Sequence, residues 1–395
     1  MYDDACALVV VDDDPLILES LAVLLGGAGR PVYLCSDIES ATVVIGQRPV
    51  SHVLLDVQFS GRFGFEGLTF VATIKAKQPG CRVIAMSGYD SSAMREETMT
   101  RGADAFVAKP FGLSEIEETL GIDVSCASYD DAEIIRFPTL TEITEGPSLF
   151  AHFQPIVDLR DPDGEPFGYE ALARYEDAPL PGNGWMFEYA RLLGHSFDIN
   201  AACVRRAIEA AADLPDDTRI FINVDPAVLA DSRDIAKVML GAAARYGVDP
   251  SLIVCELTEE MPMASGEAVF EKIEHLRREG VQFALDDFGT GYVHLGYAAA
   301  IRPSFLKISN NLGTAFENDE TKGRIVRSLF GLAKALDCQM IVEGVESEAT
   351  ATAARRAGIP LAQGYYFGMP DAAGAFTSDN CCSRSRIFRV PLTVA

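Results

Sequence analysis

The chain has 395 residues and is strongly acidic, with 33 lysines and arginines against 58 aspartates and glutamates and a formal net charge of −25. This length is too great for one typical domain and sufficient for two domains with hydrophobic cores of their own. Because duplex nucleic acid and anionic membrane surfaces bind clustered Lys and Arg, the charge argues against both as main partners.

The N-terminus and the cysteines predict a soluble cytoplasmic protein with reduced thiols. MYDDAC lacks a basic region followed by an apolar stretch, and no segment approaches the ~18 uninterrupted apolar residues that a membrane span needs. The nine cysteines form no CxxC pair, and Cys35, Cys81 and Cys255 lie within apolar runs. Cys381 and Cys382 lie in a polar segment, where we expect a loose tail rather than a redox centre.

Residues 1–120 alternate short apolar runs with helix-length amphipathic stretches. The expected strands are 6–11, 32–36, 52–57, 81–87 and 105–109, and the expected helices are 15–29, 37–47, 65–78, 91–102 and 112–120. This α/β pattern predicts a doubly wound five-stranded parallel sheet, whose ligand site lies at the carboxyl ends of the strands. Residues 121–147 are polar and acidic and predict a linker, with a short ordered piece at 134–137.

Residues 148–375 show a second alternation of strands and helices. The eight expected strands are 153–159, 168–174, 219–224, 252–257, 281–288, 305–309, 340–345 and 362–367. The pattern predicts a TIM-like (β/α)8 barrel. Only about seven residues (RDPDGEP) separate the first two strands, too few for a crossover helix, so we expect a hairpin and one antiparallel strand. We expect residues 376–395 to form a C-terminal tail.

Polar residues gather at the strand ends of the first domain. Asp12 and Asp13 follow its first strand, Asp56 ends the third, Ser87 the fourth and Lys109 the fifth. Any one of them alone is typical of an acidic turn or an ordinary strand end. Together they predict a site in which carboxylates share Mg²⁺, Asp56 acts as nucleophile toward a phosphoryl donor, and Lys109 and Ser87 stabilise the transferred group.

In VVVDDDP, LLDV, AMSG and AFVAKPF this segment resembles the response-regulator receiver family. The resemblance implies an acid pair at Asp12 and Asp13 that holds one Mg²⁺ with Asp56, and phosphorylation of Asp56. It implies a switch formed by Ser87, Phe106 and Lys109, and a sensor histidine kinase or phosphotransfer protein as partner. The family's Met-Pro turn after the acceptor is replaced by Phe59-Ser60 followed by GRFGFEG, so we expect a differently shaped loop and an unusual output surface.

The strand ends of the second domain also carry polar side chains, at Glu170, Asn223, Glu256, Asp286, Asp287, Lys307, Glu343 and Gln363. Barrel enzymes place their chemistry at this rim. Oxygen ligands without His or Cys favour Mg²⁺ or Mn²⁺ over zinc, and the consecutive aspartates suit a pair of ions. The simpler interpretation is a set of solvated strand ends. Gly289 and Gly291 fit either a turn or a mobile loop beside the aspartates.

FQPIVDL, EALAR, INVDP, ELTEE, LDDFGTGY, LKIS, VEGVES and AQGYYFG resemble, in order and spacing, the EAL-domain cyclic di-GMP phosphodiesterases of bacteria. The resemblance implies a first metal on Glu170, Asn223, Glu256 and Asp286, a second on Asp286, Asp287 and Glu343, and a catalytic centre of Lys307, Glu343 and Glu170. It implies substrate contacts from Gln154, Leu172, Arg174, Glu346 and Gln363. It also implies a homodimer, and a loop braced by Glu259.

Two departures from the family pattern lead to an alternative. Lys307-Ile308 is followed by Ser309 where the family has Asp, and residues 175–195 lack the usual pattern, so we expect one wall of the cleft to differ. The predicted function is phosphorylation-regulated, metal-dependent hydrolysis of cyclic di-GMP to linear pGpG. The alternatives are a module that binds cyclic di-GMP without cutting it and signals through a protein partner, and a barrel enzyme for another phosphate ester.

Overall fold

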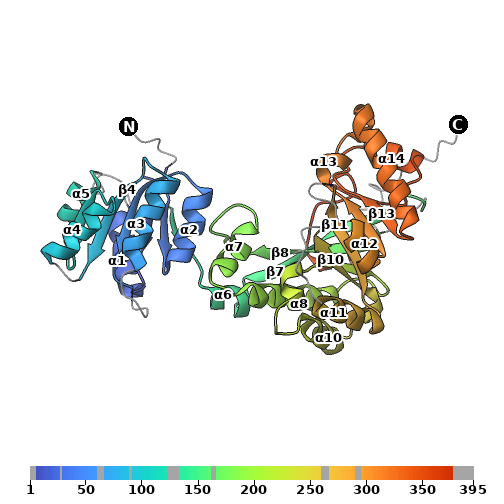
Figure 1. Ribbon diagram of the computed structural model, residues 1–395, viewed down its shortest axis with the longest axis horizontal. Coiled ribbons are helices and arrows are strands. Elements are labelled where there is room, and N and C mark those ends of the chain that lie inside the picture. Colours follow the sequence, from blue (N-terminus) through green and yellow to red (C-terminus); the bar gives the residue numbers. More distant parts are fainter. Residues whose placement is uncertain are drawn as a thin grey trace. The chain divides into compact units, whose positions relative to one another are not determined.

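The computed structural model describes residues 6–26, 29–59, 66–88, 91–121, 133–161, 166–258, 267–289 and 295–376 (Figure 1). The chain divides into two compact units. The first contains residues 1–143 and 177–195, and the second contains 144–176 and 196–395. The expected tail, with Cys381 and Cys382, lies almost wholly outside the described residues, and so do Glu259 and Gly291.

The first unit is built on a parallel sheet of six strands in the order β5-β4-β3-β1-β2-β6. The strands are β1 (Ala7–Val11), β2 (Val32–Cys35), β3 (Val50–Asp56), β4 (Arg82–Ser87), β5 (Ala105–Ala108) and β6 (Ile134–Arg136). The helices between the first five are α1 (Pro15–Leu25), α2 (Ile38–Gln47), α3 (Glu66–Lys77), α4 (Ser92–Thr100) and α5 (Leu113–Leu120). Strands β1, β2 and β3 are buried along their whole length, as a sheet covered on both faces requires.

The doubly wound parallel sheet is confirmed, but the expected number of strands is wrong by one. The sixth strand comes from the segment expected as a linker, where Ile134 pairs with Val32 and Ile135 with Tyr33. This pairing satisfies the edge of β2, whose peptide groups would otherwise lack partners. The ordered piece predicted at 134–137 is therefore part of the sheet.

Helix starts in the first unit follow from local capping residues. Asp14 accepts a hydrogen bond from Leu16 N at the start of α1, Asp37 accepts one from Ser40 N at the start of α2, and Ser91 accepts one from Met94 N at the start of α4. Side-chain oxygens at this position satisfy amide groups that have no partner within the helix. The three caps fix where the chain turns after β1, β2 and β4.

The second unit is a closed barrel with the strand order β10-β11-β12-β13-β14-β7-β8-β9. Its strands are β7 (Leu149–Asp158), β8 (Pro166–Tyr175), β9 (Arg219–Asn223), β10 (Ile253–Thr258), β11 (Gln282–Phe288), β12 (Phe305–Ile308), β13 (Gln339–Val342) and β14 (Leu361–Gln363). Strand β7 is antiparallel to both β8 and β14, so the expected hairpin and single antiparallel strand are confirmed. Strand β14 ends at Gln363, earlier than expected, and the following Gly364 passes close to Val345, where a Cβ would meet the carbonyl oxygen at 2.2 Å.

The helices of the second unit cover the outside of the barrel. They are α8 (Ser196–Ala211), α9 (Pro226–Leu229), α10 (Ile235–Tyr246), α11 (Glu267–Arg278), α12 (Leu295–Ile301), α13 (Asn310–Gly313), α14 (Glu320–Ala335) and α15 (Glu348–Arg356). Helix α6 (Leu140–Glu145) precedes β7, and α7 (Gly184–Leu192) belongs to the first unit. Among the described residues, no helix is long and apolar enough to cross a bilayer.

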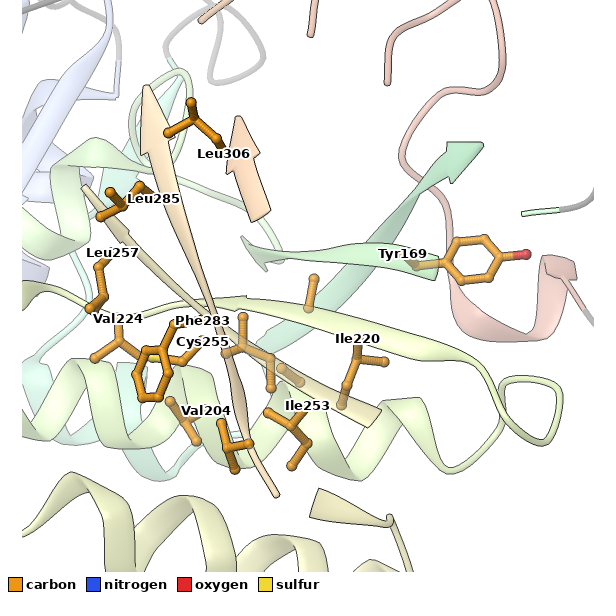
Figure 2. Packing of buried hydrophobic residues seen from close by; sticks show 14 of the residues in the cluster. Tyr169, Val204, Ile220, Val224, Ile253, Cys255, Leu257, Phe283, Leu285 and Leu306 are labelled. Atoms are coloured by element: carbon orange, nitrogen blue, oxygen red, sulfur yellow. The ribbon is translucent and has the colours of Figure 1, made fainter. Parts of the chain in front are cut away.

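Alternation along each barrel strand separates two hydrophobic layers. Figure 2 shows Ile253, Cys255 and Leu257 of β10 in the outer layer with Val204 of α8. The residues of the other parity fill the barrel interior, one from each of seven strands: Ile156, Phe221, Val254, Ala284, Phe305, Ile341 and Leu361. Because side chains alternate with a period of two, a residue two positions from this inner layer also points inward.

Candidate functional site

Three carboxylates meet at the carboxyl edge of the first unit's sheet. Asp12, Asp13 and Asp56 each offer an oxygen, and these oxygens lie within 4.8 Å of one another. Lys109 Nζ lies 2.5 Å from Asp12 Oδ2 and 2.7 Å from Asp56 Oδ2. The four residues come from the ends of β1, β3 and β5, so the predicted cluster is brought together.

Electrostatics keep Lys109 charged in this site. Burial opposes the charge on Lys109, but its hydrogen bonds to Asp12 and Asp56 outweigh burial and raise the pKa of the ammonium group. Burial also raises the pKa of the Asp12 carboxyl, despite the ammonium beside it. A divalent cation favours the ionised form of a buried carboxyl, so this site suits a bound cation.

The predicted switch residues occupy the neighbouring strands. Ser87 is fully buried at the end of β4, and its Oγ lies 3.1 Å from Gln58 Oε1. Phe106 on β5 is buried, with the guanidinium of Arg95 lying 4.7 Å from its ring centre. Residues 60–65 of the unusual GRFGFEG loop lie outside the described part of the chain.

A single buried lysine organises the rim of the barrel. Lys307 Nζ lies 2.9 Å from both Glu256 Oε1 and Glu343 Oε1, 3.1 Å from Glu170 Oε2 and 3.4 Å from Asp286 Oδ1. Lys307 is 0% exposed, and the carboxylates come from β8, β10, β11 and the residue following β13. Five predicted site residues from five strand ends therefore meet at one point.

The inner layer of the barrel explains this convergence. Glu256, Asp286, Lys307 and Glu343 each lie two residues beyond an inner-layer side chain, namely Val254, Ala284, Phe305 and Ile341. Asn223 and Gln363 follow Phe221 and Leu361 in the same way. Gln154 precedes Ile156 by two residues, since β7 runs in the opposite direction. The same alternation that fills the barrel interior thus builds the site above it.

Amide side chains hold Glu170 in place. Asn223 Nδ2 lies 2.8 Å from Glu170 Oε1, and Gln363 Nε2 lies 2.8 Å from Glu170 Oε2. Gln363 Nε2 also lies 3.2 Å from Gln154 Oε1. Burial opposes ionisation of Glu170, but the charge of Lys307 and the hydrogen bonds from Gln363, Asn223 and Lys307 together outweigh burial and lower the pKa of Glu170. Glu170 therefore stays a carboxylate within the cluster.

The consecutive aspartates share the rim because β11 is irregular at their position. Regular alternation would send Asp286 and Asp287 to opposite faces of the strand. The pairing of β11 with β12 shifts register between Leu285 and Phe288, and Asp287 has a φ of 53°, in the left-handed region. Both aspartates consequently line the same cavity.

This cavity has a volume of about 370 Å³ and opens above the Lys307 cluster. Its predicted lining residues are Gln154, Glu170, Leu172, Asp286, Asp287, Glu343, Glu346 and Gln363. Asn223, Glu256 and Arg174 are predicted site residues that are not among those lining the cavity. Asn223 and Glu256 contact residues of the Lys307 cluster, and Arg174 donates a hydrogen bond to the carbonyl oxygen of Ala173. None of the residues 175–195 is among the lining residues of this cavity, and the expectation that they change one wall of the cleft stays a prediction.

Five further lining residues escaped the sequence analysis: Asn310, Thr314, Gly344, Gly364 and Tyr365. Asn310 and Thr314 belong to a polar run directly after β12, and Tyr365 follows Gln363 by two residues. Polar residues immediately beyond each strand end were therefore a usable signal. Gly344 is needed because a Cβ there would meet Thr314 Oγ1 at 2.5 Å and Asn310 Oδ1 at 2.9 Å.

Residues 139–370, more than half of the chain, match the family model described as EAL domain. The chain is a member of the EAL-domain family. Residues 8–121 match the model described as response regulator receiver domain, so the chain joins a receiver domain to an EAL domain. Both resemblances seen in the sequence are confirmed.

Named relatives share this EAL domain. RocR of Pseudomonas aeruginosa, named a cyclic di-GMP phosphodiesterase, is 26% identical over 386 residues, covering 92% of this chain and 95% of RocR. PdeI of Escherichia coli K12, named a probable cyclic di-GMP phosphodiesterase, is 32% identical over 271 residues, covering 65% of this chain and 32% of PdeI. The chain spans about a third of the length of the first curated relatives it matches.

A solved structure of an EAL phosphodiesterase agrees with the barrel. The cyclic di-GMP complex of MucR from Pseudomonas aeruginosa matches with a TM-score of 0.53 and 28% identity, covering 60% of this chain and 98% of that one. This coverage corresponds to the EAL domain rather than the receiver.

The EAL site suits hard divalent cations. Among the described residues, the ammonium of Lys307 is the partner of Glu256 Oε1 and of Asp286 Oδ1, and Glu256 Oε2 accepts no hydrogen bond. Burial raises the pKa of Glu256 well above its usual value and that of Glu343 to about 7. Several buried carboxylates that share one ammonium group are costly unless a further cation compensates their charge. The donor set is all oxygen, so the residues fit Mg²⁺ or Mn²⁺.

Ser309 differs from the expected aspartate without disturbing this cluster. It is 1% exposed, follows Lys307 by two residues, and precedes α13. Its Oγ makes no hydrogen bond to a described residue. A small hydroxyl therefore stands at the edge of the site where the EAL family has a charged group.

Proposed function

We propose that this protein hydrolyses one phosphodiester bond of cyclic di-GMP to give linear pGpG, with divalent metal ions, under control of its receiver domain. The observation that carries the proposal is the cluster of four carboxylates within 3.4 Å of Lys307 Nζ at the base of a cavity. The names of RocR, PdeI and MucR support cyclic di-GMP as substrate.

The metal ions would be held by two overlapping sets of residues. Glu170, Asn223, Glu256 and Asp286 would hold the first, and Asp286, Asp287 and Glu343 the second. Bound metal ions activate water and neutralise charge on the phosphoryl group. The position of Asp286 supports a place in both sets, because its Oδ1 lies 3.4 Å from Lys307 Nζ within the cluster and both Asp286 and Asp287 line the cavity.

The chain's own residues position the substrate and protect the reaction. Lys307 places a fixed positive charge beside the phosphoryl group, where negative charge grows during attack by water. Gln154, Leu172, Glu346 and Gln363 line the cavity and would contact the nucleotide, with Arg174 approaching a phosphate. Water adds to phosphorus and one P–O3′ bond breaks, so the product carries a 5′-phosphate at one end and a 3′-hydroxyl at the other.

Turnover of cyclic di-GMP by the purified full chain tests this proposal. We expect pGpG to accumulate with Mg²⁺ or Mn²⁺ and to stop accumulating when a chelator is added. Glu170→Gln should lose most of the activity, because it removes a carboxylate that Lys307, Asn223 and Gln363 hold in place. Intact cyclic di-GMP in both the free and the phosphorylated receiver state would show that the proposed reaction is wrong.

Ser309 favours a second candidate, an EAL domain that binds cyclic di-GMP and signals to a protein partner without cutting it. Its hydroxyl cannot supply the negative charge of a carboxylate beside the second metal. Ser309→Asp separates the two functions. A gain in turnover of about tenfold or more, equivalent to ~1.4 kcal/mol, would favour a naturally impaired binding module. Unchanged turnover from an active parent would favour the enzyme.

The receiver half of the proposal concerns Asp56. A histidine kinase or phosphotransfer protein would donate a phosphoryl group, forming a P–O bond to Asp56 and breaking the P–N bond of the donor histidine. One Mg²⁺ held by Asp12, Asp13 and Asp56 would neutralise the phosphoryl oxygens. Phosphorylation adds about −1.5 to −2 charge. A homodimer and a cytoplasmic location also stay predictions from the sequence.

A further inference from the structure

Residues 177–195 lie within the range that matches the EAL family, but they pack into the compact unit of the receiver. Trp185 and Tyr189 of α7 are 0% and 1% exposed. Both rings contact Phe137, which follows β6, with ring centres 5.3 Å and 5.1 Å apart in edge-to-face geometry. Aromatic pairs of this kind add to the stability gained by burial. Helix α7 is therefore a firmly packed part of the receiver unit.

A polar contact joins α7 to the start of α2. Tyr189 Oη lies 2.6 Å from Asp37 Oδ2, while Asp37 Oδ1 accepts the Ser40 amide that begins α2. Burial and the neighbouring Asp37 carboxylate raise the pKa of the Tyr189 hydroxyl, so the hydroxyl keeps its proton and donates. We call Asp37, Phe137, Trp185 and Tyr189 the α7 clasp.

The α7 clasp is connected to the phosphorylation site through the end of β2. The amide of Asp12 donates to the carbonyl of Cys35 at 3.1 Å, and the amide of Phe137 donates to Leu34 at 2.9 Å. Asp37 follows Cys35 by two residues. Asp12 in turn shares Lys109 with Asp56. Lys109 and Asp12 therefore form a chain of contacts from Asp56 to the strand end that supports the clasp.

Residues 177–195 are also joined through the chain to β8, one of the strands that contribute residues to the EAL site. Strand β8 ends at Tyr175 and contributes Glu170 and Leu172 to the cavity. The chain enters the segment at Asp177, with a φ of 51°, and leaves it beyond Gly194, with a φ of 75°. Both ends therefore turn sharply, and the eight residues 176–183 join the end of β8 to the start of α7.

We propose that the α7 clasp is the element through which the receiver controls the barrel, so that the state of Asp56 alters the packing of α7 and thereby the position of β8. The inference rests on the proposed function, since it concerns regulation of that same site. It assigns the output of this receiver to the β2–β6 edge and α2. The clasp is a local contact that includes the partly buried hydrogen bond between Tyr189 and Asp37, so a charge change nearby can shift its equilibrium.

The test uses the full chain with and without beryllofluoride, a non-covalent mimic of the phosphoryl group. Tyr189→Phe removes the hydroxyl bonded to Asp37 and keeps the ring against Phe137. Phe187→Ala is the matched control, because Phe187 lies on the same helix and is 37% exposed. The two readouts are the ratio of cyclic di-GMP hydrolysis rates in the two states and hydrogen exchange of the backbone amides of α7.

We expect beryllofluoride to change both the hydrolysis rate and the exchange of α7 in the unmodified chain. Tyr189→Phe should bring the ratio of rates closer to one by about threefold or more, whereas Phe187→Ala should leave it unchanged. Trp185→Ala should change the ratio in the same direction as Tyr189→Phe. If Trp185→Ala does not fold, the more conservative Tyr189→Phe still tests the proposal.

The outcomes separate the two proposals. If the unmodified chain hydrolyses cyclic di-GMP and responds to beryllofluoride while Tyr189→Phe responds equally, the α7 clasp is not the route and the proposed function stands. If the chain hydrolyses cyclic di-GMP but ignores beryllofluoride, both the regulation and the clasp are refuted. If no hydrolysis occurs, the reaction is wrong, and α7 exchange that is identical in the two states refutes the clasp as well.

Discussion

Replacing Lys307 by methionine should destabilise the barrel strongly in the absence of metal ions. Lys307 Nζ is the ammonium that faces the carboxylates of Glu170, Glu256, Asp286 and Glu343 within 3.4 Å. Methionine keeps most of the side-chain volume, so the change removes charge rather than packing. Removing one partner from a buried ion pair costs about 3–5 kcal/mol, because the remaining charges stay buried without compensation.

For a unit of this size, a loss of about 3–5 kcal/mol lowers the melting temperature by roughly 6–20 °C. Calorimetry of the full chain in a chelator should show this shift in the barrel transition. Mn²⁺ should recover a larger part of the stability in Lys307→Met than in the parent, since a cation can take over the compensation of the carboxylates. Trp185 belongs to the other unit, so calorimetry is preferred to tryptophan fluorescence.

The matched control is Lys237→Met, an exposed lysine on α10 of the same unit. Surface changes of this kind usually alter the free energy of unfolding by less than about 0.5 kcal/mol. A barrel transition of Lys307→Met that stays within about 1 °C of the parent in chelator would refute the idea that Lys307 compensates the buried carboxylates.

Three further predictions concern the receiver unit. Burial, with the charge of Arg30, lowers the pKa of His52 from 6.5 to about 4, so the neutral form is native and stability is lost as the pH falls from 6.5 toward 4. The free energy of unfolding should fall by about 2 kcal/mol between pH 7 and pH 5. Urea unfolding at the two pH values should show this loss in the parent and not in His52→Gln. Equal losses in the two proteins would contradict the assignment of the pH dependence to His52. Gly67→Ala should destabilise the receiver by about 1–3 kcal/mol, because the new Cβ would meet Asp56 O at 2.4 Å and Val57 Cα at 2.7 Å; a neutral effect in thermal unfolding would show that α3 can move away. Asp56→Asn should abolish any change of hydrolysis rate with acetyl phosphate, and a variant that still responds would place the phosphorylation elsewhere.

Much of the site could be read from the sequence because each contributing residue is adjacent to a strong local pattern. Glu256, Asp286 and Glu343 end short apolar runs, and parallel strands with intervening helices bring such ends to one rim. Asp12 and Asp56 were found in the same way in the receiver. The hairpin of β7 and β8 followed from a connection too short for a helix.

Other features depended on contacts that no local pattern contains. The central position of Lys307 among four carboxylates follows from closure of the barrel. The shared orientation of Asp286 and Asp287 depends on a register shift between β11 and β12, which a strand seen alone does not reveal. Asn310 and Thr314 line the cavity because the chain folds back after β12.

The sequence by itself determined the two domains, their families and the residues at the strand ends, because periodicity and motif spacing are properties of neighbouring residues. Only the tertiary structure decided which surface each amphipathic segment covers, since an apolar face does not specify its partner. Ile134 and Ile135 complete the receiver sheet, and Trp185 and Tyr189 belong to the compact unit of the receiver. These long-range contacts place a piece of the EAL sequence within that unit.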